Sequence, residues 1–549
     1  MPGLMIPPRW SCDPAQAGKV AVLVGDELYT FTNEPPRDNA KWPWPLVFDG
    51  GMERVKSAVT FCGLLIGLLA DGVETLMVTP MLGNRFDSQF DHEMVRDWPR
   101  CALPEALEYE SAGELKVHPL SSRSFGLSSL GGVVAQFAQG GPLLCVYGPD
   151  ALEGWGLLDD GLPSITWFRA RVLASAWLHA SYALGQRLRF SASYSGLALM
   201  RQQLASQEKR LNLEPPDEDY RALIRGAQAH PLSWARPYVR PAPANPLEAD
   251  AETVPVWAYD RNFSWITSAR EVPVGNPEPV HEVIVNTPGV YFVSMTPPAD
   301  ALQDLALEPG PICENGRWVH ETRGAWAWEP TLRYALAHGY HVEVITGYAW
   351  PRSQRVDLRS WNDRVWAARR ELASLSQARE FLAGDVGRLG ERLVKAAARA
   401  ALGRLNQVRG YAMASLTTID PEDARHLDIG DHGELTGYGE VEAPLGRSDL
   451  VRPEWWSTFV SQANERLLTV AHLYAPTHQV VCAYFDGVYL LREAPELDGP
   501  PLKAGGWHLE HAVRVSAAAL RTGNAGRIVR ACNEADALPT IASERTVRG

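Results

Sequence analysis

Two aspartates in this sequence each follow directly after an apolar run of β-forming residues. Asp260 ends the run 256–259, and Asp486 ends the run 479–485. Carboxylates at strand ends can hold two divalent ions about 4 Å apart, which activate a hydroxyl nucleophile and stabilise a leaving phosphate group. Two aspartates are the least that a protein must supply to such a site. Taken singly, an aspartate after a strand is more often a turn or helix-cap residue.

The elements that must position these aspartates follow from hydrophobic periodicity. Short β-rich runs predict strands at 20–24, 256–260, 282–285, 291–295, 341–347 and 479–485. Periodic segments rich in alanine and leucine predict helices at about 168–186, 197–211, 329–338, 360–375, 386–408, 455–474 and 509–521. Helices and strands are mixed and no internal repeat is visible, so the expected class is α/β or α+β.

The bulk composition is that of a multidomain globular protein. The 549 residues exceed what one hydrophobic core supports, so two to four domains are expected. The longest apolar run, 60–70, is too short to cross a bilayer, and residues 1–9 lack the pattern of an export signal. Seven scattered cysteines without a C-x-x-C pair favour a reducing compartment, so we expect a cytoplasmic protein that does not contact membranes.

The chain is acidic overall, but its charges are distributed unevenly along the sequence. A net charge of −13 argues against a surface with a general affinity for nucleic acid. Residues 351–410 carry 13 Arg or Lys against 6 Asp or Glu, a local surplus of the kind that contacts phosphates. An ordinary solvated helical face explains this surplus equally well.

The residues around Asp260 resemble a known motif. The segment from Asp260 to Trp265, DRNFSW, is similar to the palm motif D-x-N-S-L-Y of family B DNA polymerases. Residues 272–277, VPVGNP, match the P-x-G-x-P that follows in the protein-primed branch of phages and linear plasmids. The resemblance implies that Asp260 binds metal, that Asn262 and Trp265 bind the nucleotide, and that Trp265 packs under the deoxyribose.

Two cations downstream resemble the nucleotide-binding residues of the same family. Residues 395–403 keep the lysine and the glycine of the fingers motif K-x-x-x-N-S-x-Y-G as Lys395 and Gly403. A lysine can reach a triphosphate as a mobile point charge, so it can persist while its neighbours change. Residues 361–369 resemble the first fingers helix, which implies that Arg369 is a second phosphate-binding cation.

The segment around Asp486 is similar to the third polymerase motif, Y-x-D-T-D-S. Aligned on the flanking apolar residues, Asp486 takes the place of the second aspartate, the metal ligand, and Tyr484 that of the first. An alternative register makes Tyr484 the motif tyrosine. It would put Val488 at the ligand position and leave no site.

Weaker similarities imply contacts with DNA. Residues 224–227, which include Arg225 and Gly226, resemble the Y-x-G-G linker between exonuclease and polymerase lobes. Residues 506–510 resemble G-x-W-x-x-E, and Arg521 then stands where the family has its primer-binding K-x-Y. A plain turn at 225–226 and a plain hairpin at 505–506 are equally open interpretations.

The N-terminal part lacks the carboxylates of a proofreading nuclease. Asp13 stands where a D-x-E motif would begin, but Ala15 replaces the glutamate. Asp87 lies in a segment similar to N-x-x-F-D, and residues 167–178 contain no aspartate. Hydrolysis at a 3′ end needs two metals held by several carboxylates, so we expect an inactive exonuclease-like fold in which Asp13 and Asp87 are cap or turn residues.

The resemblance as a whole implies a multidomain right-hand polymerase (palm, fingers and thumb) with an N-terminal RNase H-like exonuclease-type domain. The expected divisions are 1–215 exonuclease-like, 216–277 palm start, 278–355 palm insertion, 356–410 fingers, 411–453 second insertion, 454–503 palm end and 504–549 thumb and tail. It also implies two Mg²⁺ or Mn²⁺ ions and, as partners, a DNA template-primer, dNTPs and a terminal priming protein.

The function expected from these residues is DNA-directed DNA synthesis by a monomer, with proofreading lost and with protein-primed replication of a linear phage or plasmid genome in a bacterial cytoplasm. One alternative is a polymerase-like scaffold that binds DNA or a priming protein without catalysis. A second alternative, suggested by 19 tryptophans and the acidic charge, is a carbohydrate-active enzyme with paired carboxylates in an aromatic cleft.

Overall fold

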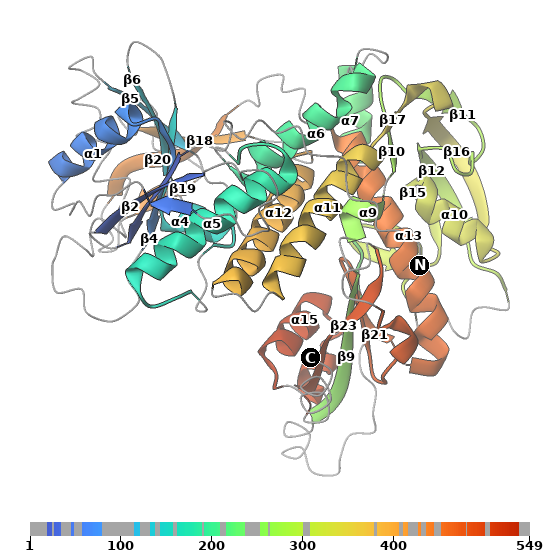
Figure 1. Ribbon diagram of the computed structural model, residues 1–549. Coiled ribbons are helices and arrows are strands. Elements are labelled where there is room, and N and C mark those ends of the chain that lie inside the picture. Colours follow the sequence, from blue (N-terminus) through green and yellow to red (C-terminus); the bar gives the residue numbers. More distant parts are fainter. Residues whose placement is uncertain are drawn as a thin grey trace, which may run out of the picture. The chain divides into compact units, whose positions relative to one another are not determined.

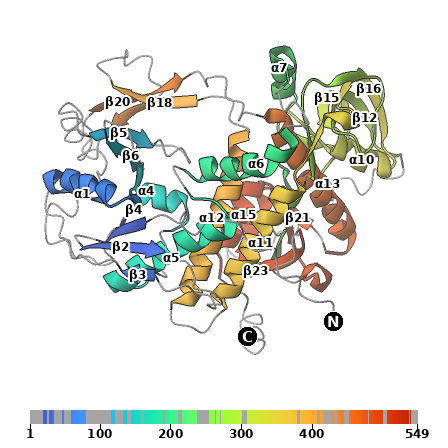
Figure 2. The same cartoon turned by 45° about the horizontal axis from the view of Figure 1, so that its top comes forward.

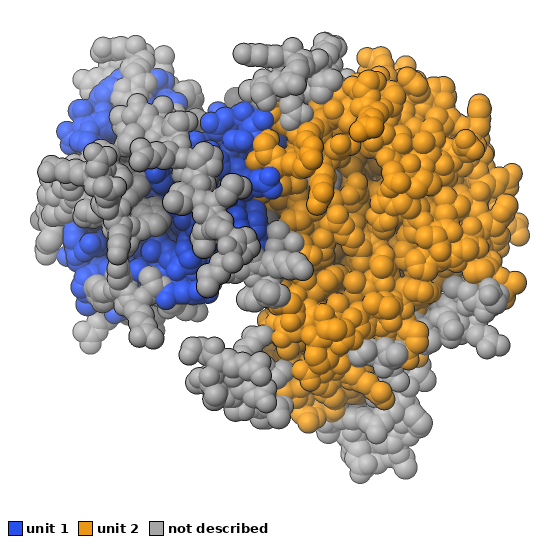
Figure 3. Space-filling view, turned by 45° about the vertical axis from the view of Figure 1, so that its right-hand side comes forward, with its two compact units in different colours: residues 1–203, 363–450 blue, residues 204–362, 451–549 orange. Residues whose placement is uncertain are grey.

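The computed structural model of the protein contains both helices and strands, arranged in two units. We describe each unit by itself. Unit 1 comprises residues 1–203 and 363–450, and unit 2 comprises 204–362 and 451–549 (Figure 3). The structure describes residues 19–24, 27–33, 46–48, 58–79, 115–120, 132–137, 143–157, 162–188, 191–208, 216–236, 253–261, 264–268, 270–299, 308–377, 382–405, 410–415, 426–429, 435–443, 452–478, 480–499, 505–536 and 538.

Unit 1 is built on a seven-stranded mixed sheet in the order β3-β2-β1-β4-β7-β6-β5. Its strands are β1 Lys19–Val24, β2 Glu27–Asn33, β3 Leu46–Phe48, β4 Val73–Thr79, β5 Leu115–Leu120, β6 Gly132–Phe137 and β7 Leu144–Tyr147. The strand β1 is antiparallel to β2 and parallel to β4, and β4 is parallel to β7. A separate three-stranded sheet in this unit has the order β18-β20-β19, with β18 Gly410–Ser415, β19 His426–Ile429 and β20 Leu435–Ala443.

Helices cover the seven-stranded sheet and extend unit 1. They are α1 Ala58–Ala70, α4 Pro149–Gly154, α5 Thr166–Leu184, α6 Ala192–Glu208, α11 Arg359–Ser376 and α12 Ala383–Leu405, of which α6 and α11 continue into unit 2. The almost wholly buried α5 packs against β1, β2 and α12 (Figure 2). Gly196 lets α6 approach α12, because a Cβ there would lie 2.1 Å from the carbonyl oxygen of Ala397.

Unit 2 is centred on a five-stranded sheet in the order β23-β9-β22-β21-β8. Its strands are β8 Ser233–Ala235, β9 Thr253–Arg261, β21 Val480–Tyr484, β22 Gly487–Leu490 and β23 Trp507–Ser516. Alternate residues of β9 face opposite sides: Val256 and Ala258 pack with α15, and Tyr259 packs with α13. The sheet therefore has apolar cover on both faces, from α13 Pro453–His478 on one and from α14 Ala517–Arg521 and α15 Ala525–Glu534 on the other (Figure 1).

The rest of unit 2 forms a second layer of short strands and helices. A four-stranded sheet has the order β11-β16-β12-β15, and it packs on α10 through Leu332 and Ala335. The elements are α7 Glu218–Gly226, α9 Ser264–Ser268, β10 Glu271–Pro273, β11 Glu278–Val280, β12 Gly289–Thr296, β13 Ile312–Glu314, β14 Arg317–Val319, β15 Thr322–Trp328, α10 Glu329–Ala337, β16 His341–Ala349, η4 Arg352–Gln354, β17 Arg355–Asp357 and η6 Pro495–Leu497.

Most elements expected from the sequence are present, and two are wrong. Residues 509–521 were expected to form a helix, but β23 runs through Ser516 and only α14 is helical, because β-branched Val513 and Val515 pack in the sheet core. Residues 282–285 were expected to form a strand but are irregular and lead into a turn over 284–287, in which Asn286 takes a left-handed conformation with φ 61°.

Among the described helices, none combines the length and apolar composition that spanning a bilayer requires. The four cysteines whose side chains the structure describes, Cys145, Cys313, Cys482 and Cys532, are all free thiols.

The buried His179 on α5 makes the stability of unit 1 sensitive to acid. Burial lowers the pKa of His179 from 6.5 to about 3, so between these values the unfolded chain binds a proton that the folded chain does not. We therefore expect the free energy of unfolding to fall as the pH drops below about 6.5, by up to about 1.4 kcal/mol per pH unit from this residue. Urea unfolding of the parent and of His179→Leu at pH 7, 6, 5 and 4 measures this slope.

His179→Leu should flatten the pH dependence, and His341→Leu, which replaces an exposed histidine, should not. Equal slopes for the parent and His179→Leu would contradict the assignment.

Candidate active site

The structure brings Asp260 and Asp486 to the same edge of the five-stranded sheet. Asp260 is the penultimate residue of β9, and Asp486 lies in the two-residue turn that connects β21 to β22. In the antiparallel ladder between β22 and β9, Gly487 pairs with Asp260, so Asp486 is one position away across the ladder. The backbone N–H of Arg261 donates to the carbonyl oxygen of Asp486 at 3.2 Å, which ties the two segments together.

The turn that carries Asp486 is held from helix α13. The side-chain oxygen of Asn464, a buried residue of α13, accepts a hydrogen bond from the N–H of Leu232 at 2.9 Å. The carbonyl oxygen of Leu232 in turn accepts the N–H of Phe485 at 2.7 Å. These two bonds connect the helix to the tip of the hairpin, so the position of Asp486 depends on a buried amide three turns along α13.

The same turn contains a strained residue. Phe485 has φ 56°, the left-handed region that a bulky side chain avoids and that glycine usually occupies at the first central position of a tight hairpin turn. Its ring lies 4.4 Å from that of Tyr484, and the residue is 37% exposed. Strain of this kind persists only where surrounding contacts determine the backbone, and it is concentrated at functional sites.

Asp260 lies on the face of the sheet that α14 and α15 cover. It shares this face with Val256 and Ala258, and it is half-buried at the end of the strand. The residue opposite on β22 is Gly487, which has no side chain, and the ring of Tyr489 from the same strand lies over it. Burial raises the pKa of Tyr489, and the negative charge of Asp260 contributes to this shift. On its other side β23 places His508 directly opposite Asp260.

Arg261, the residue after Asp260, fixes the end of β9. Its Nε donates to the carbonyl oxygen of Gly505 at 2.9 Å, and its Nη1 donates to the hydroxyls of Ser264 and Ser268 at 3.3 and 3.4 Å. Gly505 has φ +65°, and a Cβ there would lie 2.7 Å from the guanidinium. The arginine therefore fastens the end of β9 to α9 and to the segment before β23.

The charges around Arg261 include a second guanidinium. The pKa of Arg261 is lowered to about 9, first by burial and then by nearby Arg466, while the charge of Asp486 opposes both effects. Arg261 therefore stays protonated at neutral pH. Arg466 of α13 donates to the carbonyl oxygens of Thr267 and Ser268 at 3.0 and 3.2 Å, so it caps the C-terminal end of α9. The two cations make this edge of the sheet favourable for an anion.

Asp260 and Asp486 supply the only two carboxylates that the sequence predicted for a metal site. In the described part of the chain, no three side chains of His, Cys, Asp or Glu gather into a group that could hold a metal ion. Two carboxylates fit Mg²⁺, which keeps several waters and takes further oxygen ligands from substrate phosphates. The pair therefore fits a site that a phosphorylated substrate completes.

The predicted phosphate-binding cations lie in unit 1. Arg369 is a buried residue of α11, and its Nε donates to Glu391 of α12 at 2.6 Å. Its guanidinium also lies 5.4 Å from the ring of Trp366. Lys395 is half-buried on α12, one helical turn after Glu391. The structure thus brings these two cations to one helix pair of unit 1, whereas Asp260 and Asp486 belong to unit 2.

The other predicted site residues are placed as follows. Arg225 and Gly226 end α7, where Arg225 donates to Glu218 at 3.1 Å, and this helix packs with Trp328 and Trp350 rather than with the five-stranded sheet. Arg521 is the last residue of α14. The structure does not describe Asn262, Asp13 and Asp87, nor the side chain of Trp265 on α9.

Several residues that shape the site were not expected from the sequence. Arg261 could have been noticed, because a basic residue directly after an apolar strand needs polar partners if it is buried. Asn464 and Arg466 carry no such signal, since each acts on a segment about 200 positions away in the sequence: Asn464 on Leu232, and Arg466 on Thr267.

Comparisons with known proteins give structural similarity alone. No protein-family model and no curated protein matches this chain. The chain is similar to phi29 DNA polymerase complexed with primer-template DNA and incoming nucleotide substrates, with a TM-score of 0.48, 12% identity, and coverage of 91% of this chain and 85% of that chain. It is also similar to the same polymerase in a post-translocation binary complex with primer-template DNA, with a TM-score of 0.47, 12% identity, and coverage of 83% and 78%. Similarity at this level assigns neither a family nor an activity.

The strain at Phe485 predicts an unusual stability effect. Phe485→Ala removes the ring but leaves the left-handed backbone strained, whereas Phe485→Gly removes both the ring and the strain. We expect the glycine variant to be more stable than the alanine variant by about 1 kcal/mol. Urea unfolding of both variants measures the difference. An alanine variant as stable as the glycine variant would show that Phe485 is not strained.

Proposed function

We propose that this protein is a DNA-directed DNA polymerase that transfers nucleotides by two-metal catalysis. The observation that supports this most strongly is the pairing of Gly487 with Asp260, which puts Asp486 beside Asp260 at one sheet edge. These aspartates come from segments more than 200 residues apart, and each directly follows an apolar run of β-forming residues. Two-metal nucleotidyl transfer requires at least two carboxylates that can share the ions, and neighbouring backbone positions allow Asp260 and Asp486 to supply them.

In this proposal Asp260 and Asp486 hold two Mg²⁺ or Mn²⁺ ions. When bound, the ions supply charge that activates the primer hydroxyl and stabilises the leaving pyrophosphate. The chain's own residues orient the two carboxylates. Arg261 restrains the end of β9 through Gly505, and Asn464 restrains the hairpin turn through Leu232.

The remaining partners follow from the resemblance of the motifs. Lys395 and Arg369 would bind the triphosphate of a dNTP, with Asn262 and Trp265 near its sugar. Arg225, Gly226 and Arg521 would contact the template-primer. The enzyme would act as a monomer in the cytoplasm of a bacterial host, primed by a terminal protein, and its N-terminal exonuclease-like domain would lack nuclease activity.

A second candidate function is a polymerase-like scaffold that binds DNA or a priming protein without catalysis. One observation favours it: Arg369 is already paired with Glu391, with side chains 11% and 25% exposed, so a phosphate would have to displace a half-buried carboxylate. The two candidates differ in what the aspartates do, because only the polymerase needs their charge for its activity.

The two functions are separated by primer extension on a primed DNA template with Mg²⁺ or Mn²⁺. We expect Asp260→Ala and Asp486→Ala each to reduce incorporation by at least about a thousandfold, because loss of either ligand removes metal from the transition state. Both variants should still bind primed DNA.

The matched control is Asp219→Ala, which removes an exposed carboxylate of α7 in the same unit. This variant should retain full incorporation. If the parent binds primed DNA but incorporates no nucleotide with either ion, the scaffold is the correct function.

A further inference from the structure

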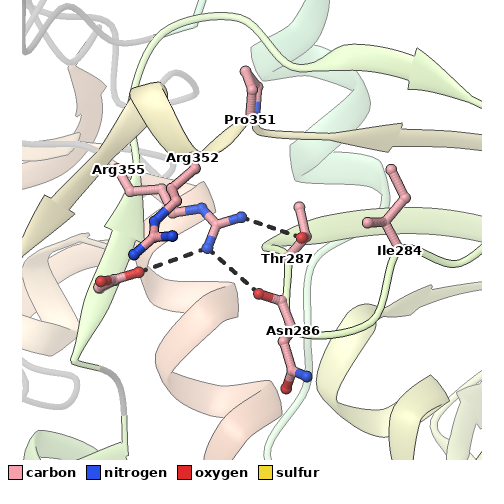
Figure 4. A pocket seen from close by; sticks show the side chains of 7 residues that line it. Ile284, Asn286, Thr287, Pro351, Arg352 and Arg355 are labelled. Carbon is pink, nitrogen blue, oxygen red and sulfur yellow. Dashed lines mark hydrogen bonds and ion pairs between the residues drawn. The ribbon is translucent and has the colours of Figure 1, made fainter.

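A pocket of about 510 Å³ lies in unit 2 beside the pair of strands β10 and β17. It is lined by Glu271, Ile284, Asn286, Thr287, Pro351, Arg352 and Arg355 (Figure 4). These residues come from β10, from the turn between β11 and β12, and from the segment that leads through η4 into β17. The volume is in the range of pockets that bind small organic ligands.

Two guanidinium groups face one carboxylate around this pocket. Arg352 begins the 3₁₀ turn η4, Arg355 begins β17 directly after it, and both side chains border the pocket (Figure 4). Glu271 is 49% exposed, and its carboxylate lies 3.6 Å from Arg355, a loose ion pair. Arg352 is exposed, and it has no ion-pair partner among the residues that the structure describes. The pocket therefore has a net positive charge.

Residues Asn286 and Thr287, on the opposite side of the pocket, hold the side chain of Arg355 in place before a ligand binds. Arg355 is 13% exposed, and its Nη2 donates to the hydroxyl of Thr287 at 3.1 Å while Nη1 approaches the carbonyl oxygen of Asn286 at 3.4 Å (Figure 4). A guanidinium fixed in this way loses little conformational freedom when it binds an anion.

The wall of the pocket formed by residues 284–288 is rigid, because hydrogen bonds to neighbouring elements hold it. The N–H of Asn286 donates to buried Glu329 at 2.7 Å, and its side-chain oxygen accepts from Arg333 at 3.0 Å. The N–H of Ile284 donates to the hydroxyl of Tyr291 at 3.1 Å, and the N–H of Trp350 donates to the carbonyl oxygen of Pro288 at 2.9 Å. The pocket is thus preformed rather than assembled by a ligand.

We propose that this pocket binds a nucleoside phosphate unit, either as a free nucleotide or within a single-stranded nucleic acid. Paired guanidinium groups match the geometry of a phosphate. The volume exceeds that of a phosphate alone, and the apolar wall of Pro351 and Ile284, which is 40% exposed, offers a surface for a base. The proposal does not depend on Asp260 or Asp486, so binding should persist in Asp260→Ala.

Binding is measured without metal, by calorimetry with a deoxynucleoside monophosphate and by fluorescence anisotropy with a labelled oligodeoxythymidylate. Arg352→Glu should weaken binding by at least about tenfold, because it replaces a cation that contacts phosphate with an anion. The control Arg317→Glu makes the same charge change at an exposed arginine of β14 that does not line the pocket, and it should bind as the parent does.

The site is supported if Arg352→Glu weakens the binding of both ligands and Arg317→Glu does not. If Arg352→Glu weakens the binding of only one ligand, that result shows whether the site takes the free nucleotide or the single-stranded nucleic acid. If Arg352→Glu and Arg317→Glu weaken binding equally, or if neither does, the proposal is wrong. Because Arg352 is exposed, its substitution leaves the fold intact, which thermal melting checks. Arg355→Gln provides a second variant, which removes the charge of the guanidinium fixed by Thr287 and should also weaken the binding of both ligands.

Discussion

The candidate active site depends on one constraint, the register of the antiparallel ladder between β22 and β9. Gly487 pairs with Asp260 and Val488 pairs with Tyr259, so the turn before β22 must lie beside the end of β9. A slip of one residue would turn every side chain of β22 to the opposite face, moving Val488 and Leu490 away from α13. Apolar burial on both faces of the sheet therefore determines where the backbones of Asp260 and Asp486 come to lie side by side.

Hydrogen bonds from buried polar side chains further restrain the segments that the β22–β9 ladder brings together. Asn464 spans from α13 to Leu232, Arg261 spans from β9 to Gly505, and Arg466 spans from α13 to the end of α9. Each bond satisfies a backbone group that would otherwise be costly to bury. Together they connect the end of β9, which carries Asp260, and the turn between β21 and β22, which carries Asp486, to the long helix α13 and to the elements beside it. Hydrogen bonds therefore hold both segments in place.

The sequence predicts secondary structure best where a local pattern of apolar residues matches one helix or strand. Apolar runs that end in an acid predicted both β9 and β21, and with them Asp260 and Asp486. The region 509–521 was misassigned as helical because its alanines suit a helix, whereas β23 is determined by pairing along the whole length of β9, which no local pattern reveals. Contacts between distant segments likewise determine the register of β22 on β9, the strained turn at Phe485, and the pocket of Arg352 and Arg355.

The central claim is that Asp260 and Asp486 share bound metal, and iron-directed cleavage tests it most directly. Fe²⁺ substituted for Mg²⁺ generates hydroxyl radicals in the presence of ascorbate and peroxide, and these radicals cut the peptide bonds nearest to the ion. We predict cuts near residue 260 and near residue 486 in the same reaction, mapped by mass spectrometry and suppressed by excess Mg²⁺. Cleavage near only one of the two residues, or near neither, would contradict the account.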